Sequence, residues 1–342
     1  MTKINTAVIG ATGYTGYELV RILAKHQNVN IKYLSSRSNI GVKYNNIYPQ
    51  LKYVLPDITC IEDDIEKIAN ECEVLFLAIP HGVSASKINT DILKKTKIID
   101  LSADFRLHNL EVYEKWYGTH KAPDLMENAV YGLAEIYRSG IKTASLIANA
   151  GCYTTCSILT LYPLVKNGLI DVNTIFIDAK SGVSGAGRSV NFNSMFCEAN
   201  ENVKAYKIAE HRHTPEIEQE LSVAGNQDIK VQFTPHLVPM NKGLLTTCYA
   251  KLKTGITSKD VKNAYQEQYK NEFFIRLLDD GVFPETKYVK DTNFIDINFK
   301  NDDRTGNIIA VGALDNLIKG ASGQAVQNMN IMFGFDEKSG LV

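Results

Sequence analysis

The sequence predicts an α/β protein of two domains, a doubly wound parallel sheet followed by a mixed α+β domain. Its 342 residues exceed one domain of about 150. In the first 150 residues, short apolar runs alternate with helix-like stretches, which is typical of parallel strands covered on both faces. From about residue 152, strand-like runs are separated by longer excursions, which favours a mixed, partly antiparallel sheet.

The elements of the first domain follow from these runs. A helix is expected over Tyr17–Lys25, where the apolar residues have helical spacing. The expected strands are Asn5–Ile9, Ile31–Leu34, Val74–Ile79, Ile98–Ile99 and Leu146–Ala148.

The second domain is expected to span residues 151–320. Its predicted strands are Thr174–Ala179, Ile229–Phe233 and Leu244–Leu252. Its predicted helices are Cys152–Lys166, Pro215–Val223 and Ser258–Tyr269. A final helix, Ser322–Phe333, is expected to pack back on the first domain, which would then comprise residues 1–150 and about 321–342.

Composition excludes several classes of protein. The 37 Lys and Arg nearly balance the 38 Asp and Glu, which argues against a nucleic-acid binder. A hydrophobic fraction of 44% is that of a globular protein, and no apolar run approaches the 18 or so residues of a transmembrane helix. The six cysteines form no CxxC pair, so we expect reduced thiols and a cytoplasmic location.

A glycine-rich loop, Gly10–Gly16, lies between the first predicted strand and helix. Its GxxGxxG pattern lets the backbone approach a pyrophosphate held at the helix N-terminus, as in Rossmann-type domains, although such turns are also common without a ligand. The second strand ends in Ser36 and Arg37, without the carboxylate that an NAD ribose would need. An arginine suits a 2′-phosphate and favours NADP, unless Arg37 is simply a solvated loop residue.

Cys152 follows Gly151 and begins a predicted helix. Amide groups at a helix N-terminus lower the pKa of a thiol, which gives a nucleophile; the alternative is a buried structural cysteine. We accept that alternative for Cys60, Cys72, Cys156, Cys197 and Cys248. A reactive thiol in a nicotinamide enzyme indicates an acyl thioester that exchanges hydride.

Two further segments carry candidate groups. His211 and His213 would share a face if their segment is extended, and either suits acid/base chemistry, as opposed to being merely exposed. With Glu216 they lack a further metal ligand, so no metal site is expected. Arg106 follows a predicted strand and suits an anionic substrate group or an ion pair with Asp104.

The remaining glycine-rich and histidine-containing loops leave more than one interpretation open. Ser181–Arg188 is either a generic loop or a close approach to the nicotinamide, and His81 is a loop or a site residue.

Taken together, these segments resemble the N-acetyl-gamma-glutamyl-phosphate reductases, an arginine-biosynthetic family among the aspartate-semialdehyde-dehydrogenase-like enzymes. The resemblance covers almost the whole chain in order, and GCYTT with HRHTPEI is its most specific part. The matching phrases are GATGYTG (10–16), FLAIPHGVS (76–84), DLSADFRL (100–107), YGLAE (131–135), NAGCYTT (149–155), KSGVSGAGR (180–188), HRHTPEI (211–217), FTPHLVPM (233–240) and GQAVQNMN (323–330).

The resemblance implies NADPH-dependent reductive dephosphorylation of N-acetyl-L-glutamyl 5-phosphate to the 5-semialdehyde, by a homo-oligomer that pairs through an exposed sheet. Cys152 would be the nucleophile, and His211, ahead of His213, its acid/base partner. Arg106 would hold the substrate phosphate, and Glu216 and Ser181 are assigned to the substrate with it. The implied cofactor residues are Gly10, Thr12, Gly13, Tyr14, Gly16, Ser36 and Arg37 in the dinucleotide site and Ser184, Gly185 and Asn328 near the nicotinamide.

The chain departs from the family pattern at three positions. Ala150 and Ala134 stand where proline is usual, and Lys242 where arginine is usual. A lysine keeps the charge but loses the bidentate geometry of arginine. Two rival functions stay open: reduction of another acyl phosphate (aspartyl, or carrier-bound aminoadipyl or glutamyl) and a non-catalytic NADP-sensing protein.

Overall fold

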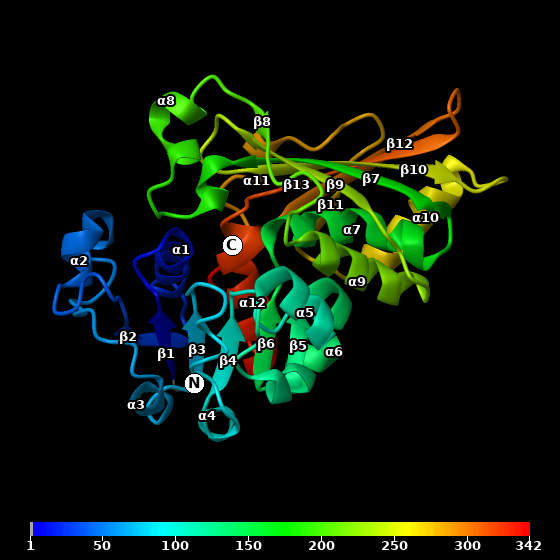
Figure 1. Ribbon diagram of the computed structural model, residues 1–342. Coiled ribbons are helices and arrows are strands. Elements are labelled where there is room, and N and C mark those ends of the chain that lie inside the picture. The colour runs from blue at the N-terminus through cyan, green and yellow to red at the C-terminus, as the bar shows by residue number, and fades with distance from the viewer. Residues whose placement is uncertain (1–2) are drawn as a thin grey trace. The chain divides into compact units, whose positions relative to one another are not determined.

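The structure is a computed structural model that describes residues 3–342. The chain divides into two compact units (Figure 1). The first unit comprises the residues up to Ala150 together with Ala321–Val342, and the second unit is Gly151–Gly320. Among the described residues, no helix has the length and apolar character needed to cross a membrane.

The first unit is built on a six-stranded parallel sheet of order β2-β1-β3-β4-β6-β5. The central strands are almost wholly buried, which is why they read as continuous apolar runs in the sequence. The strands are β1 (Ile4–Ile9), β2 (Val29–Leu34), β3 (Val74–Leu77), β4 (Lys97–Asp100), β5 (Ala129–Gly132) and β6 (Leu146–Asn149).

Helices cover both faces of this sheet. On one face, apolar residues of α3 and α4 pack on the strands, and on the other α1, α6 and α12 lie together. The predicted doubly wound sheet is thereby confirmed. The helices are α1 (Tyr14–Leu23), α2 (Tyr44–Ile47), η1 (Pro49–Leu51), α3 (Ile65–Ala69), α4 (Thr90–Lys95), α5 (Leu110–Tyr117), η2 (Pro123–Asn128), α6 (Ala134–Thr143) and α12 (Gly323–Phe333).

The second unit is built on a seven-stranded sheet of order β11-β12-β13-β10-β7-β9-β8. Strand pairs β7–β9 and β11–β12 are parallel and the other pairs are antiparallel, so the predicted mixed sheet is confirmed. The strands are β7 (Ile170–Gly182), β8 (Lys204–Ala205), β9 (Gln232–Val238), β10 (Leu244–Leu252), β11 (Ile275–Leu277), β12 (Ile295–Asp302) and β13 (Asn307–Leu314).

One face of this sheet packs on α7, which lies beside α9 and α10 (Figure 1). Thr246 of β10 points toward α7, since its Oγ1 lies 3.3 Å from the Sγ of Cys156. The neighbouring β10 residues Leu245 and Thr247 therefore point to the opposite face. The helical elements are α7 (Cys152–Lys166), η3 (Val183–Ala186), η4 (Phe192–Ser194), α8 (Phe196–Ala199), α9 (Thr214–Gly225), α10 (Ser258–Tyr269), α11 (Thr286–Val289) and the π-turn η5 (Ile318–Ser322).

The prediction of a strand at Ile229–Phe233 is wrong in its bounds, because β9 begins only at Gln232 and continues to Val238. The amide of Ile229 donates to the Ser222 hydroxyl and that of Val231 to the Glu218 carboxylate. Side chains of α9 thus take up the hydrogen bonds that a strand would make. Five short or late strands were not predicted from the sequence: β5, β8, β11, β12 and β13.

Candidate active site

The glycine loop of the first unit is shaped by two close backbone approaches. Gly10 has φ +81°, and a Cβ on it would collide with the carbonyl of Ala78. A Cβ on Gly16 would collide with the carbonyl of Gly10. Helix α1 then begins after Gly13, and no side chain caps its N-terminus. The loop therefore presents a helix N-terminus of the kind that binds phosphate groups.

Side chains from later segments hold this loop in place. The hydroxyls of Tyr44 and Tyr48 donate to the carbonyls of Ala11 (2.8 Å) and Thr12 (2.7 Å). The hydroxyls of Thr12 and Ser36 lie 2.8 Å apart, so two predicted cofactor residues are brought together. The two tyrosines were not found from the sequence, because nothing in the residues around them marks a contact with a loop more than 30 residues earlier.

Arg37 lies at the surface just after β2, with 64% of its side chain exposed. Its guanidinium is 3.3 Å from the carboxylate of Asp63, which also pairs with Lys87 at 3.1 Å. Arg37 is therefore neither buried nor unrestrained: a carboxylate shared between two cations orients it.

Arg106 lies in the loop after β4 and is almost completely buried, with 7% exposure. Its Nη2 donates to the carbonyl of Leu101 at 2.8 Å. Asp100, the last residue of β4, and Asp104 in the loop are both fully buried. Burial, reinforced by the neighbouring charge of Asp104, raises the pKa of Asp100 to about 6.

Two amide side chains of α12 lie one helical turn apart in the first unit. Asn328 donates through Nδ2 to the carbonyl of Gly132 (2.9 Å) and to Oδ1 of Asn149 (3.0 Å). Gln324 is fully buried, and neither its Oε1 nor its Nε2 has a hydrogen-bond partner among the described residues. A buried amide in that state is a candidate contact for a polar ligand. The sequence analysis singled out Asn328 but not Gln324.

In the second unit, Cys152 is the first residue of α7 and is partly exposed. No side chain caps the helix at Gly151, so its N-terminal amide groups face the thiol's surroundings. The fully buried Glu216 accepts hydrogen bonds from the amide of Gly151 (3.1 Å) and the hydroxyl of Thr154 (2.9 Å). Glu216 therefore fixes the start of the helix that carries Cys152.

Gly320 lies directly against Cys152. A Cβ on Gly320 would be 2.7 Å from the Cβ of Cys152 and 3.0 Å from its Cα. In the sequence, the two residues stand near the first and the last residue of the second unit. Only a glycine at position 320 leaves room for their contact. The sequence analysis did not single out Gly320, because its significance depends on this tertiary approach.

His211 is held between aromatic rings and hydrogen-bond partners. Its Nδ1 accepts from the amide of His213 at 3.1 Å, so the neutral ring carries its proton on Nε2. That Nε2 lies 3.5 Å from the hydroxyl of Tyr206. Burial, with the nearby charges of His213, Lys207 and Arg212, lowers the pKa of His211 to about 2. The imidazole is neutral throughout the physiological range.

Two tyrosines link the histidines to the cysteine. The hydroxyls of Tyr206 and Tyr153 lie 3.4 Å apart, and the ring of Tyr153 meets that of His211 edge-on at 5.6 Å. Burial raises the pKa of Tyr206 to about 12. Tyr153 directly follows Cys152 in α7, so its contacts bring Tyr206 and His211 beside the start of the helix that carries Cys152. The sequence analysis did not single out the two tyrosines.

The second glycine-rich segment is also part of the second unit. The hydroxyl of Ser184 accepts from Nδ2 of Asn316 at 3.0 Å. A Cβ on Gly185 would lie 3.0 Å from the hydroxyl of the buried Ser181, so these three predicted residues are neighbours. Lys242, one of the departures from the family pattern, forms an ion pair with Asp291 at 2.7 Å.

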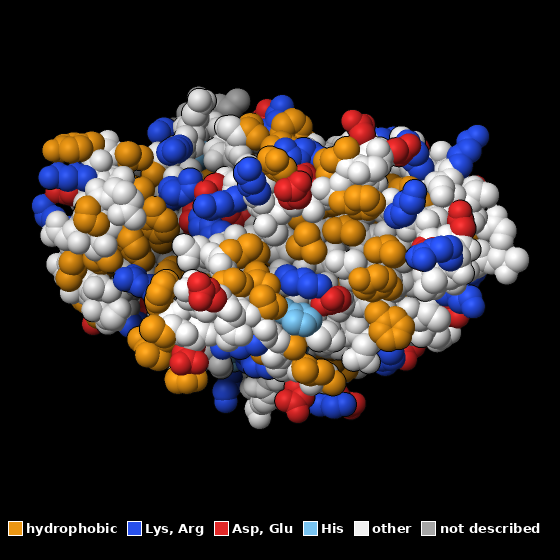
Figure 2. All heavy atoms as spheres, turned by 90° about the horizontal axis from the view of Figure 1, so that it is seen from above, with side chains coloured by type: hydrophobic (Ala, Val, Ile, Leu, Met, Phe, Trp, Pro, Cys, Tyr) orange, Lys and Arg blue, Asp and Glu red, His pale blue; other side chains and the backbone are white. Residues whose placement is uncertain are grey.

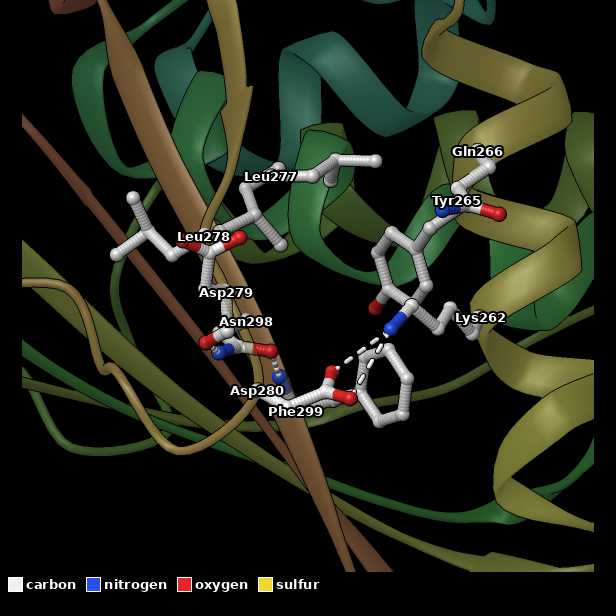
Figure 3. A pocket seen from close by; sticks show the side chains of 10 residues that line it. Lys262, Tyr265, Gln266, Leu277, Leu278, Asp279, Asp280, Asn298 and Phe299 are labelled. Carbon is white, nitrogen blue, oxygen red and sulfur yellow. Dashed lines mark hydrogen bonds and ion pairs between the residues drawn. The ribbon is translucent and has the colours of Figure 1, made fainter.

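A cavity of about 170 Å³ lies elsewhere in the second unit, between α10 and strands β11 and β12 (Figure 3). Lys262 and Asp280 pair across it at 3.0 Å, and Tyr265 stacks on Phe299 with ring centroids 5.3 Å apart. None of the predicted site residues lines it. Among the described residues, no cluster of His, Cys, Asp or Glu is suited to hold a metal ion.

Similar proteins identify the family. Residues 5–144 match the NAD binding domain of the semialdehyde dehydrogenases, and residues 152–316 match their dimerisation domain. The N-acetyl-gamma-glutamyl-phosphate reductase of Campylobacter jejuni subsp. jejuni (strain 81116) is 55% identical over 99% of this chain and 98% of its own. That of Lachnospira eligens is 54% identical over the same shares.

Solved structures agree on the fold. Aspartate semialdehyde dehydrogenase II of Vibrio cholerae has a TM-score of 0.72 at 18% identity, covering 97% of this chain and 99% of its own. The Candida albicans enzyme, solved with NADP, has a TM-score of 0.68 at 17% identity over 97% and 99%. The chain belongs to the semialdehyde dehydrogenase family, within the group of the N-acetyl-gamma-glutamyl-phosphate reductases.

Proposed function

We propose that the protein reduces N-acetyl-L-glutamyl 5-phosphate to N-acetyl-L-glutamate 5-semialdehyde with NADPH, releasing phosphate. The observation that carries this proposal is Cys152 at the uncapped start of α7, next to Tyr153, which contacts both His211 and Tyr206. We place the enzyme in the cytoplasm, where the thiols of its six cysteines stay reduced.

The reaction divides into two steps at Cys152. The thiolate attacks the acyl carbon, and phosphate leaves with the electron pair of the carbon–oxygen bond, which leaves a thioester on Sγ. NADPH, when bound, supplies the hydride that reduces this thioester. The tetrahedral oxyanion that results forms the carbonyl of the aldehyde as the carbon–sulfur bond breaks, so the aldehyde departs and the thiolate is restored.

His211 would serve the reacting oxygen. Because its neutral ring has the proton on Nε2, it donates a hydrogen bond to the oxyanion that develops in each step. Tyr206 lies beside the same nitrogen. The backbone amide of His213 fixes this tautomer, which supports His211 ahead of His213 as the acid/base group.

The residues of the first unit fit NADP. The uncapped start of α1 and the missing Cβ atoms of Gly10 and Gly16 form a cradle for the pyrophosphate. Ser36 and the exposed guanidinium of Arg37 would bind the adenosine end and its 2′-phosphate. The buried amides of Gln324 and Asn328 offer hydrogen bonds to the carboxamide of the nicotinamide.

Three of the predicted residues would act on the acyl phosphate. Arg106 would bind its phosphate as a charge-assisted pair. Ser181 would contact the acyl group, and Glu216 would act on the substrate through the segment Gly151–Thr154 that it holds.

The protein would work as a homodimer formed by the sheet face opposite to α7. Figure 2 shows this side, where hydrophobic side chains gather between charged ones. Phe176 and Tyr249 are 55% and 37% exposed on neighbouring strands, and Leu245 lies four residues before Tyr249 on the same face. A dimer would bury this apolar surface, in keeping with the dimerisation domain of the family.

The reverse reaction tests the proposal. Wild-type protein is incubated with phosphate, NADP or NAD, and one of two aldehydes, N-acetylglutamate semialdehyde or aspartate semialdehyde, and NADPH or NADH formation is followed. We expect the highest kcat/KM with N-acetylglutamate semialdehyde and NADP, and dependence on phosphate. A preference for aspartate semialdehyde, or no phosphate-dependent turnover with either aldehyde, would overturn the proposal.

A further inference from the structure

We propose that Asp104 is a positioning residue that sets Arg106 for the phosphate of the substrate. The inference rests on the proposed function, because it assigns Arg106 to that phosphate. It extends that function to a fully buried carboxylate, whose role is argued from contacts within the first unit.

The carboxylate of Asp104 binds two other segments at once. Its Oδ1 accepts from the amide of Gly82 at 2.6 Å and from the hydroxyl of Tyr113 at 2.9 Å. Its Oδ2 accepts from the amide of Ala85 at 2.9 Å. Asp104 is fully buried, so these charge-assisted hydrogen bonds form in a medium that strengthens them. The loop after β3 and helix α5 are thereby tied to the loop after β4.

Further hydrogen bonds close the same assembly. Asp100 accepts from the hydroxyls of Ser84 and Ser102, both at 2.7 Å, which joins the two loops a second time. The backbone carbonyl of Asp104 accepts from Nε2 of His120 at 2.7 Å. The backbone of residues 100–104 is therefore fixed on both sides.

Arg106 follows directly in this fixed segment. Its amide donates to the carbonyl of Ala103 and its Nη2 to that of Leu101, so both its backbone and its guanidinium rest on the segment that Asp104 holds. The segment follows β4 at the carboxyl edge of the parallel sheet, where open α/β sheets bind ligands. A phosphate-binding arginine is effective when its direction is set before the ligand arrives.

The experiment measures the reverse reaction of Asp104→Asn with phosphate, NADP and N-acetylglutamate semialdehyde each varied in turn. The amide cannot accept all three hydrogen bonds, so the loop loses its fixed direction while its shape is nearly kept. We expect the KM for phosphate to rise at least about tenfold, since small misplacements of a binding group have effects up to about 10²-fold. The KM values for NADP and the aldehyde should stay within about twofold of wild type.

Two further variants separate positioning from general destabilisation. Glu337→Gln breaks the paired hydrogen bonds of Glu337 with Arg138, at 2.9 and 3.0 Å, on the α6 side of the same unit, and should leave the phosphate KM unchanged. Tyr113→Phe removes one of the three donors to Asp104 and should raise the phosphate KM at least about twofold. Tyr113→Phe decides the question if Asp104→Asn fails to fold.

A double-mutant cycle shows whether Asp104 acts through Arg106. Adding Asp104→Asn to Arg106→Ala should leave the already raised phosphate KM within about twofold. Independent effects in the double variant, or an unchanged phosphate KM in both Asp104→Asn and Tyr113→Phe, would overturn the inference alone. A wild-type protein without phosphate-dependent turnover would overturn the proposed function, and with it the basis of the inference.

Discussion

At His211 the two ring nitrogens have different surroundings, and this difference gives the residue its chemistry. Nδ1 accepts from a backbone amide 3.1 Å away, and Nε2 faces the hydroxyl of Tyr206. The two contacts fix the tautomer, and burial lowers the pKa to about 2. A histidine in this state acts as a neutral donor and acceptor, and it does not carry a positive charge into the reaction.

The lowered pKa of His211 predicts acid sensitivity. An unfolded chain binds a proton at this histidine below about pH 6.5, and the folded protein does not, so the contribution to stability is full above that pH and is lost as the pH falls. At about pH 5 the loss is on the order of 2 kcal/mol. Urea unfolding should show His211→Gln losing that much less stability than wild type between about pH 7.5 and pH 5. Equal losses would contradict the buried neutral histidine.

The sequence predicts residues whose chemistry is visible in a short motif, and misses those defined by distant partners. Cys152 and His211 stand in recognisable phrases, and the structure places both in the second unit with Tyr206. Tyr206 has no local signal, because its partners Tyr153 and His211 come together only in the folded unit. Gln324 is an ordinary amide in a helical sequence until burial leaves it without a partner.

Among the elements, α7 shows how a helix start can be prepared for chemistry. Gly151 leaves its N-terminus without a side-chain cap, Glu216 fixes the first turn from α9, and Gly320 closes on Cys152 from η5. Three segments thus determine the position of the Cys152 side chain. Each contact has a different physical basis: an uncapped helix end, a buried carboxylate and a missing Cβ.

Gly320→Ala tests this arrangement. The new Cβ would lie 2.7 Å from the Cβ of Cys152, closer than atoms can pack, so the start of α7 must move. We expect turnover to fall at least about tenfold and the alkylation rate of Cys152 to change, with a stability loss of about 1–3 kcal/mol. Gly140→Ala in α6, whose new Cβ would lie 3.2 Å from a Val130 methyl, is the control and should keep full turnover. Wild-type turnover in Gly320→Ala would show that this contact does not set the thiol.

The accuracy of the element predictions follows the strength of local patterns. Helices α7 and α10 and strand β10 begin and end at the predicted residues, because helical spacing or alternation is unbroken there. Strand β9 was misplaced, because Ile229 is buried by packing on α9 and not by pairing in the sheet. The short strands β5 and β8 have too few residues to show the alternation of apolar and polar residues that predicts a strand.

For the whole molecule, the alternation of strands and helices was enough to predict two kinds of sheet. The order of the strands within each sheet could not be predicted from it. Neighbours such as β6 and β5 in the first sheet, or β13 and β10 in the second, pair by tertiary packing that no local segment encodes. Helix α12 returns to the first unit after about half of the chain and brings Asn328 to Asn149, three residues before Cys152.

The central claim is that Cys152 carries the acyl group during turnover. The most direct measurement incubates the protein with N-acetylglutamate semialdehyde and NADP without phosphate, follows NADPH, and analyses the peptides by mass spectrometry. With no phosphate to accept the acyl group, we predict a burst of one NADPH per site and an N-acetylglutamyl thioester on the Cys152 peptide. Cys152→Ser should give neither and still bind NADPH. A burst without an acyl group on Cys152, or one that persists in Cys152→Ser, would contradict the claim.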